Sequence, residues 1–164
     1  IAVTVADVSY SKISSTADIK ANDEVLLTFS NGGKTYAFAA ETLAKDWYLK
    51  AEEVEVSDNK ITDVKGASVL TLEAGTVADS YYFHADNGKY LNSAVSGSHY
   101  NTLLADKKDA KTSLFSVSFD DKGVLTVKNT NGVFVTGTVY KGTAEFQGAA
   151  SNNADYPLAI YKKA

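Results

Sequence analysis

Apolar and polar residues alternate with a period of two along nearly the whole chain, and this alternation limits the fold more than any other feature. Side chains of a β-strand point alternately to the two faces of a sheet, so the pattern is typical of half-buried strands. The alternating runs are rich in Val, Tyr, Phe, Thr and Leu, which suit a pleated surface. We expect strands at 3–10, 24–30, 35–40, 52–57, 68–75, 80–86, 89–94, 101–106, 114–119, 124–129, 133–138, 144–148 and 157–163.

Clusters of Asn, Asp and Gly separate these runs, and these residues favour tight turns. The clusters lie at 31–33, 58–59, 86–88, 120–123 and 131–132. Two segments depart from the alternation: 40–49 predicts a short helix, and 107–113 predicts a single helical turn. Many short strands at near-regular spacing predict an all-β barrel or sandwich. A length of 164 residues suits a single domain covering 1–164.

Three turns containing Asn-Gly mark an internal repeat. They begin at Asn31, Asn87 and Asn131, which are 56 and 44 residues apart. Each turn follows one expected strand and precedes two more. When the strand that comes before these three is included, each third of the chain has four strands. Three such units can share one core and cover most sheet edges. We therefore predict a closed β-barrel of β-trefoil type, with another β-barrel or a β-sandwich as the alternative, and type I′ turns at Asn-Gly.

Short stretches of the second and last thirds resemble β-trefoil repeats of the fascin and ricin-lectin kind. The stretches are "NGKYL" after "SYYFHAD" and "NGVFV" after "GVLTVKN". The Gln-x-Trp signature of the ricin type is absent from the sequence. No sugar-binding residue of that family is therefore carried over to this chain.

A second resemblance covers most of the chain. The segments "YSKISSTADIKANDEVLLTF", "VLTLEAGTVADSYYFHADNGKYLNS", "GVLTVKN" and "YPLAIYKK" are similar to an accessory module of secreted multidomain proteins of gut Bacteroidetes. This resemblance implies an extracellular or cell-surface location and a longer parent protein. It implies no particular reaction.

The composition argues against several classes of function. The net charge is −4, and every one of the 16 basic residues is a lysine. Without arginine the chain lacks the bidentate group that proteins favour for phosphates, so we expect no nucleic-acid partner. No apolar run approaches the ~20 residues of a membrane-spanning helix, so we expect no membrane insertion. Cysteine is absent, and no phosphate-binding loop or zinc signature occurs, so we predict no cofactor and no metal.

The ionisable residues give weak indications of catalysis. His84 and Asp86 are two residues apart on an expected strand, where a pair on one face can bind a metal or exchange a proton. Glu53 and Glu55 also share an expected strand, and their alternation is typical of a solvated surface. The turns "DDKG" and "SNNAD" offer oxygen ligands, without the spacing of a calcium loop. We predict that the protein is not an enzyme.

Aromatic residues next to polar ones provide the remaining candidate site. An exposed ring can stack against the apolar face of a sugar, while Asn and His side chains bond its hydroxyl groups. We expect one of Tyr81 and Tyr82 to face inward and the other outward, and an outward tyrosine beside a "SGSHYN" loop to help form a binding patch. The candidate ligand-binding residues are Trp47, Tyr48, Tyr82, Asn92, His99, Tyr100 and Asn101. The sequence thus predicts a non-catalytic extracellular module that binds a glycan, with a structural module that docks or spaces neighbouring protein domains as the alternative.

Overall fold

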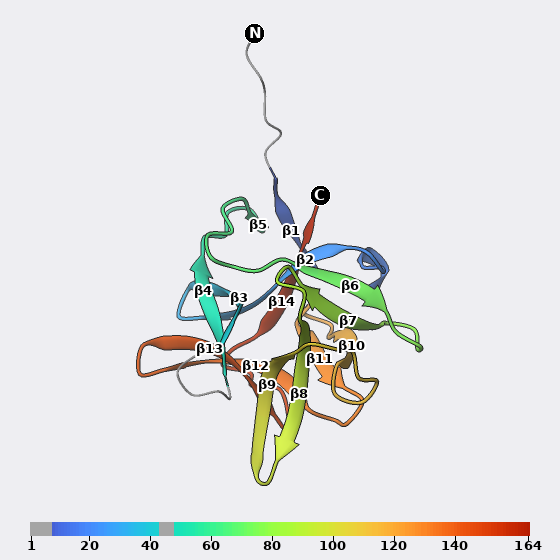
Figure 1. Ribbon diagram of the computed structural model, residues 1–164. Helices are drawn as coiled ribbons and strands as arrows, with labels where there is room; N and C mark the ends of the chain where they lie inside the picture. The colour runs from blue at the N-terminus through green and yellow to red at the C-terminus, as the bar shows by residue number, and fades with distance from the viewer. Residues whose placement is uncertain (1–7, 43–47) are drawn as a thin grey trace.

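The computed structural model describes residues 8–42 and 48–164, and this part of the chain is all-β. Figure 1 shows its elements, of which η1 is a single 3-10 turn. The elements are β1 (Tyr10–Ile13), η1 (Thr16–Asp18), β2 (Glu24–Asn31), β3 (Lys34–Thr42), β4 (Leu49–Val54), β5 (Lys60–Ile61), β6 (Leu70–Ala74), β7 (Ser80–Ala85), β8 (Tyr90–Ser96), β9 (His99–Ala105), β10 (Leu114–Phe119), β11 (Leu125–Asn129), β12 (Phe134–Tyr140), β13 (Thr143–Ala149) and β14 (Leu158–Lys163). The expectation of an all-β fold is confirmed.

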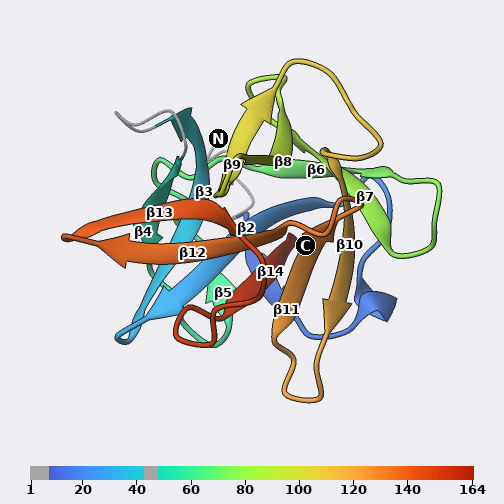
Figure 2. The same ribbon diagram turned by 90° about the horizontal axis from the view of Figure 1, so that it is seen from below.

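Six antiparallel strands form a closed ring. β2 pairs with β6, β6 with β7, β7 with β10, β10 with β11, β11 with β14, and β14 returns to β2. Figure 2 shows these strands around a common centre. Each ring strand therefore has a partner on both sides, which satisfies its backbone groups without leaving an open sheet edge.

Three hairpins extend from the ring, and they recur in the same order along the chain. β3–β4 follows ring strand β2 and precedes β6, β8–β9 lies between β7 and β10, and β12–β13 lies between β11 and β14. The turns beginning at Asn31, Asn87 and Asn131 each connect a ring strand to the first strand of its hairpin. The alignment of these turns in the sequence thus corresponds to equivalent places in the fold.

The expected type I′ turn at Asn-Gly forms at none of the three places. At the first, Asn31 pairs with Lys34, so the two central residues are Gly32 and Gly33. Gly32 and Gly33 both have positive φ angles, 59° and 79°, as type I′ requires. At Asn87 and Asn131 only the following glycine has a positive φ. There the N–H of Gly88 bonds the carbonyl of Ala85, and the N–H of Ala85 bonds the carbonyl of Lys89. Each of these two turns therefore has three residues, one more than a type I′ turn, and its glycine adopts the left-handed conformation.

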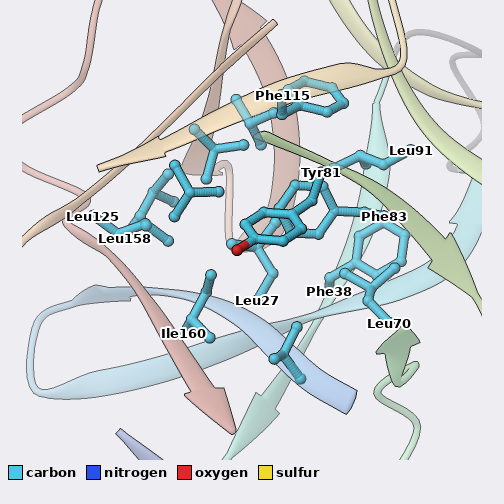
Figure 3. Packing of buried hydrophobic residues seen from close by; sticks show 14 of the residues in the cluster. Leu27, Phe38, Leu70, Tyr81, Phe83, Leu91, Phe115, Leu125, Leu158 and Ile160 are labelled. Atoms are coloured by element: carbon cyan, nitrogen blue, oxygen red, sulfur yellow. The ribbon is translucent and has the colours of Figure 1, made fainter. Parts of the chain in front are cut away.

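The core occupies the inside of the ring, and Figure 3 shows part of it. Every second residue of a ring strand points inward, as Phe83 and Tyr81 do on β7, whereas Tyr82 is half-buried on the outer face. The prediction that the two tyrosines face opposite ways is confirmed. The labelled core side chains are Leu27, Phe38, Leu70, Tyr81, Phe83, Leu91, Phe115, Leu125, Leu158 and Ile160. Burial of each such aliphatic or phenyl side chain contributes roughly 1.5–3 kcal/mol.

A second, smaller apolar cluster lies outside the ring. Its buried members are Tyr10, Leu26, Ala37, Val54, Ile61, Ala159 and Tyr161. β1 pairs with β14 on one side and with β5 on the other, so these short strands cover the outer face next to β14. This covering explains why the run "VLL" in β2 is buried on both faces instead of alternating.

Several expected elements are displaced or different. The strand expected at 3–10 begins outside the described residues, and the described strand is Tyr10–Ile13. The strand expected at 52–57 lies at Leu49–Val54. Of the helix expected at 40–49, residues 43–47 lie outside the described part, 40–42 belong to β3 and Leu49 begins β4. Near 107–113 a single turn forms, in which the N–H of Ser113 bonds the carbonyl of Asp109 at 2.9 Å.

Candidate functional site

The predicted binding residues occupy separate parts of the molecule. Trp47 lies outside the described residues, and Tyr48 is half-buried just before β4. Tyr82 on β7 and Asn92 on β8 lie on the outer face of neighbouring strands. Asn92 accepts a hydrogen bond from the Ser113 hydroxyl at 3.1 Å. Tyr82 and Asn92 are therefore on one sheet face, and His99, Tyr100 and Asn101 lie on β9, the strand that pairs with β8.

The segment "SGSHYN" is a hairpin and not the expected loop. Gly97 and Ser98 form a two-residue turn, and β9 begins at His99. Two residues are enough to reverse the chain because Gly97 adopts a φ of 62°. Tyr100 is 36% exposed opposite Val95, which is 50% exposed. Asn101 is buried, so the structure separates it from the exposed residues with which it was grouped.

A concave pocket lies between the β10–β11 turn and the segment that joins β13 to β14. Its volume is about 230 Å³. We call it the Tyr156 pocket, and its lining residues are Asp120, Val124, Leu125, Thr136, Asn152, Asn153, Ala154, Tyr156, Pro157 and Leu158. An aromatic ring, apolar side chains and three carboxylate or amide groups thus face one small hollow.

The aromatic wall of this pocket is supported by the core. The Tyr156 ring meets the edge of the Phe29 ring, with centroids 6.0 Å apart and planes at 78°. Phe29 is fully buried, and it also packs against Phe146 at 5.1 Å. A Cβ atom at Gly137 would overlap the Phe29 ring, so only glycine at this position of β12 admits the ring. The wall is therefore fixed before any ligand arrives.

Asp120, Asn152 and Asn153 each use one polar atom of the side chain for a hydrogen bond within the protein. The Asp120 Oδ1 accepts the N–H groups of Lys122 and Val124 at 2.9 and 2.8 Å. The Asn152 amide donates to the Thr126 hydroxyl at 2.6 Å, and the Asn153 Oδ1 accepts the N–H of Asp155 at 3.0 Å. Within the described part of the chain no hydrogen bond is made by Asp120 Oδ2, Asn152 Oδ1 or the Asn153 amide nitrogen. Two acceptor oxygens and the amide N–H groups of Asn153 therefore remain for a ligand.

The outer face of β6, β7 and β8 carries a second group of polar and aromatic residues. We call it the tyrosine cage, and it consists of Glu73, Tyr82, His84, Tyr90 and Lys108. The Glu73 carboxylate accepts hydrogen bonds from Lys108 at 2.7 Å and from the Tyr90 hydroxyl at 3.1 Å. The His84 Nδ1 lies 2.7 Å from the same carboxylate. The Lys108 Nζ lies 5.3 Å and 5.7 Å from the centres of the Tyr82 and Tyr90 rings.

The cage shifts the ionisation of its members. Burial raises the pKa of Glu73, but the hydrogen bonds from Lys108 and Tyr90 outweigh it, so the pKa lies below its ordinary value of 4.5. The hydrogen bond to Glu73 raises the pKa of Lys108. Both groups are therefore held in their charged forms at neutral pH.

The expected pairing of His84 with Asp86 is replaced by a different one. β7 ends at Ala85, so Asp86 belongs to the following turn, and His84 contacts Glu73 on the neighbouring strand instead. The two oxygen-rich turns considered for calcium do meet, because Asp120 and the two asparagines of "SNNAD" line the Tyr156 pocket. The described residues contain no group of three or more His, Cys, Asp or Glu close enough to hold a metal ion.

Sequence comparisons match no protein-family model and no curated protein. Among solved structures, the fold is similar to that of the lysenin pore, with a TM-score of 0.51 and 9% sequence identity. The match covers 94% of this chain and 49% of that one, so the chain spans about half the length of its neighbour. At this identity the likeness concerns the fold alone. In the described part of this chain, no helix has the length and apolar character needed to cross a membrane.

Proposed function

We propose that the chain is a β-trefoil module that binds carbohydrate without catalysing a reaction. The trefoil assignment is supported by the order of ring strand, hairpin and ring strand, which recurs three times around one core. A location outside the cell or at its surface is proposed from the resemblance to modules of secreted Bacteroidetes proteins.

The observation that carries the binding proposal is the composition of the Tyr156 pocket. Sugars present hydroxyl groups, which both donate and accept hydrogen bonds, together with apolar C–H faces. The pocket offers the acceptors Asp120 Oδ2 and Asn152 Oδ1, the donor of Asn153, and the ring of Tyr156. Since the polar groups are already fixed by other bonds, binding costs little side-chain ordering.

The same lining supports a binding role over hydrolysis. Glycoside hydrolysis uses two carboxyl groups on opposite sides of the scissile bond. Asp120 is the one carboxylate among the described residues that line the pocket, and neither histidine is among them. A volume of about 230 Å³ suits one sugar ring better than a long segment of polymer.

The test is a glycan array probed with the purified chain and with variants of the pocket. We expect Tyr156→Ala to abolish binding and Asn152→Ala to weaken it. Tyr140→Ala is the matched control, because Tyr140 is 58% exposed at the β12–β13 hairpin and outside the pocket. Circular dichroism checks that each variant is folded. Binding of no glycan, or equal binding by Tyr156→Ala and the wild type, would falsify the proposal.

The β8–β9 hairpin favours the alternative of a docking module. Val95 and Tyr100 are cross-strand partners that are both exposed near its tip, where an apolar partner surface can cover them. Chemical cross-linking of the longer parent protein that the resemblance implies, compared with its Val95→Ser/Tyr100→Ser variant, tests this role. Reduced cross-linking of this hairpin to a neighbouring domain is expected if the hairpin docks, and unchanged cross-linking argues against it.

A further inference from the structure

The tyrosine cage contains a cation in a geometry that recognition sites for ammonium ions use. The rings of Tyr82 and Tyr90 are inclined at 81°, with centroids 6.5 Å apart, so they form two walls of a corner. The Lys108 ammonium group lies over both rings and 2.7 Å from the Glu73 carboxylate. Aromatic faces attract cations through their quadrupole, and a carboxylate adds direct charge attraction.

The Tyr90 wall of this corner is held without the help of Lys108. The His84 ring stacks on the Tyr90 ring at 4.3 Å with planes only 10° apart. The Tyr90 hydroxyl and His84 Nδ1 both contact the Glu73 carboxylate. Glu73, His84 and Tyr90 lie on three adjacent strands, β6, β7 and β8, and therefore form a rigid unit.

Lys108, in contrast, belongs to an exposed connection. It lies in the connection between β9 and β10, whose residues 106–111 are all exposed, and its own side chain is 47% exposed. The connection is anchored beyond Lys108, where the Asp109 carboxylate accepts the N–H groups of Lys111 and Thr112. The lysine side chain can therefore leave the corner while the backbone of the connection stays in place.

We propose that the tyrosine cage is a binding site for an organic ammonium ion, with Lys108 as a built-in occupant that such a ligand displaces. A quaternary ammonium group suits the corner because its methyl groups contact both ring faces while its charge faces Glu73. This site is separate from the Tyr156 pocket, with which it shares no residue. It stands independently of the carbohydrate proposal.

The experiment titrates choline chloride into the wild type and Lys108→Ala, and follows the tyrosine ring resonances by NMR at constant ionic strength. Removing the occupant should tighten choline binding by about tenfold, since a side chain tethered nearby no longer competes. Tyr90→Leu in the Lys108→Ala background should abolish it. Lys128→Ala is the matched control, because Lys128 lies over the single Phe134 ring at 5.4 Å, and it should create no choline site.

A charge control and a wild-type measurement complete the test. The neutral carbon analogue of choline should bind to neither protein, because it lacks the charge that Glu73 and the rings attract. In the wild type, saturating choline should increase acylation of Lys108 by an amine reagent, measured by mass spectrometry, and leave Lys128 unchanged. Equal choline affinity in Lys108→Ala and the wild type, equal binding of the neutral analogue, or unchanged Lys108 acylation each overturns the proposal.

Discussion

The Tyr156 pocket and the tyrosine cage use similar residues and differ in what occupies them. Both combine tyrosine with a carboxylate, which lie on neighbouring strands in the cage and on two connections in the pocket. In the cage the carboxylate of Glu73 is bonded by Lys108, His84 and Tyr90. In the pocket Asp120 keeps one oxygen without a bond from the described residues. Residue types alone therefore do not separate a site that is ready for a ligand from one that the protein has filled itself.

The difference in occupancy between the cage and the pocket affects stability and binding in opposite ways. A filled site contributes its ion pairs to the stability of the fold, and a ligand must compete with them. An open site leaves polar atoms to water and gains its bonds only on binding. We therefore expect substitutions in the cage to change stability, and substitutions at the polar wall of the pocket to change binding.

The largest effect is expected from Gly137→Ala, which tests how far the pocket depends on the core. The added Cβ atom would overlap the Phe29 ring that supports Tyr156. We expect the free energy of unfolding to fall by about 3 kcal/mol, measured by urea denaturation. Gly66→Ala is the control, because its Cβ meets only the end of the flexible Glu52 side chain at 3.3 Å. Wild-type stability of Gly137→Ala would contradict this packing.

The next effect compares the two carboxylates directly. Glu73→Gln removes the charge that Lys108 contacts, and we expect it to lower the free energy of unfolding by about 1 kcal/mol. Asp120→Asn keeps an oxygen acceptor for the N–H groups of Lys122 and Val124, and its effect should stay within about 0.5 kcal/mol. Thermal unfolding measures both. If Asp120→Asn were the more destabilising change, the contrast between a filled and an open site would be lost.

The dependence on pH sharpens the same contrast. The pKa of Glu73 is lowered in the folded protein, so its ionised form stabilises the fold above pH 4.5. This contribution is lost as the pH falls through 4.5 and then through the lower pKa of the folded state. The difference in Tm between the wild type and Glu73→Gln should therefore be present at about pH 5 and disappear in more acidic buffer. A difference that grows in acid would reverse the assignment.

Salt should produce the smallest effect. The Lys108–Glu73 pair is partly exposed, so ions screen it, and the Debye length is only about 3 Å at 1 M salt. The decrease in Tm caused by Lys108→Ala should shrink when sodium chloride is raised. Glycan binding in the Tyr156 pocket should change little in the same titration. A glycan without charge is bound mainly through hydrogen bonds and ring contacts, which salt does not screen. Equal salt sensitivity of the two would remove the distinction.

Much of the ring could be predicted because alternation is a local property of the sequence. The opposite orientations of Tyr81 and Tyr82 follow from the period of a strand, and the structure shows that Tyr81 is the inward one. The equivalence of the turns at Asn31, Asn87 and Asn131 follows from their order among the strands. The start of β9 at His99 was not predicted, because Gly97 and Ser98 are typical of a loop. Two residues are nevertheless enough for a hairpin turn.

The sites could not be predicted in the same way because they depend on pairing between distant segments. His84 has Asp86 as its near neighbour in sequence, but strand pairing brings it to Glu73. Asp120 and Asn152 each appear as ordinary turn residues, and only the meeting of two connections makes them one lining. The sequence signal for this pocket is the oxygen-rich segment "SNNAD" next to "YP". It does not reveal which other turn lies opposite.

The last strand of the ring has a consequence for how the chain reaches its native state. β14 joins β11 to β2, and the hydroxyl of Thr28 bonds the carbonyl of Ala159 across 131 positions of sequence. During synthesis on the ribosome, the first five ring strands emerge with two edges unpaired, and they stay exposed until residues 158–163 leave the exit tunnel. Such long-range closure slows folding and leaves nascent chains open to aggregation. We therefore expect the fold to be completed only once residues 158–163 have emerged, and a chaperone to shield the waiting edges of β2 and β11 until then.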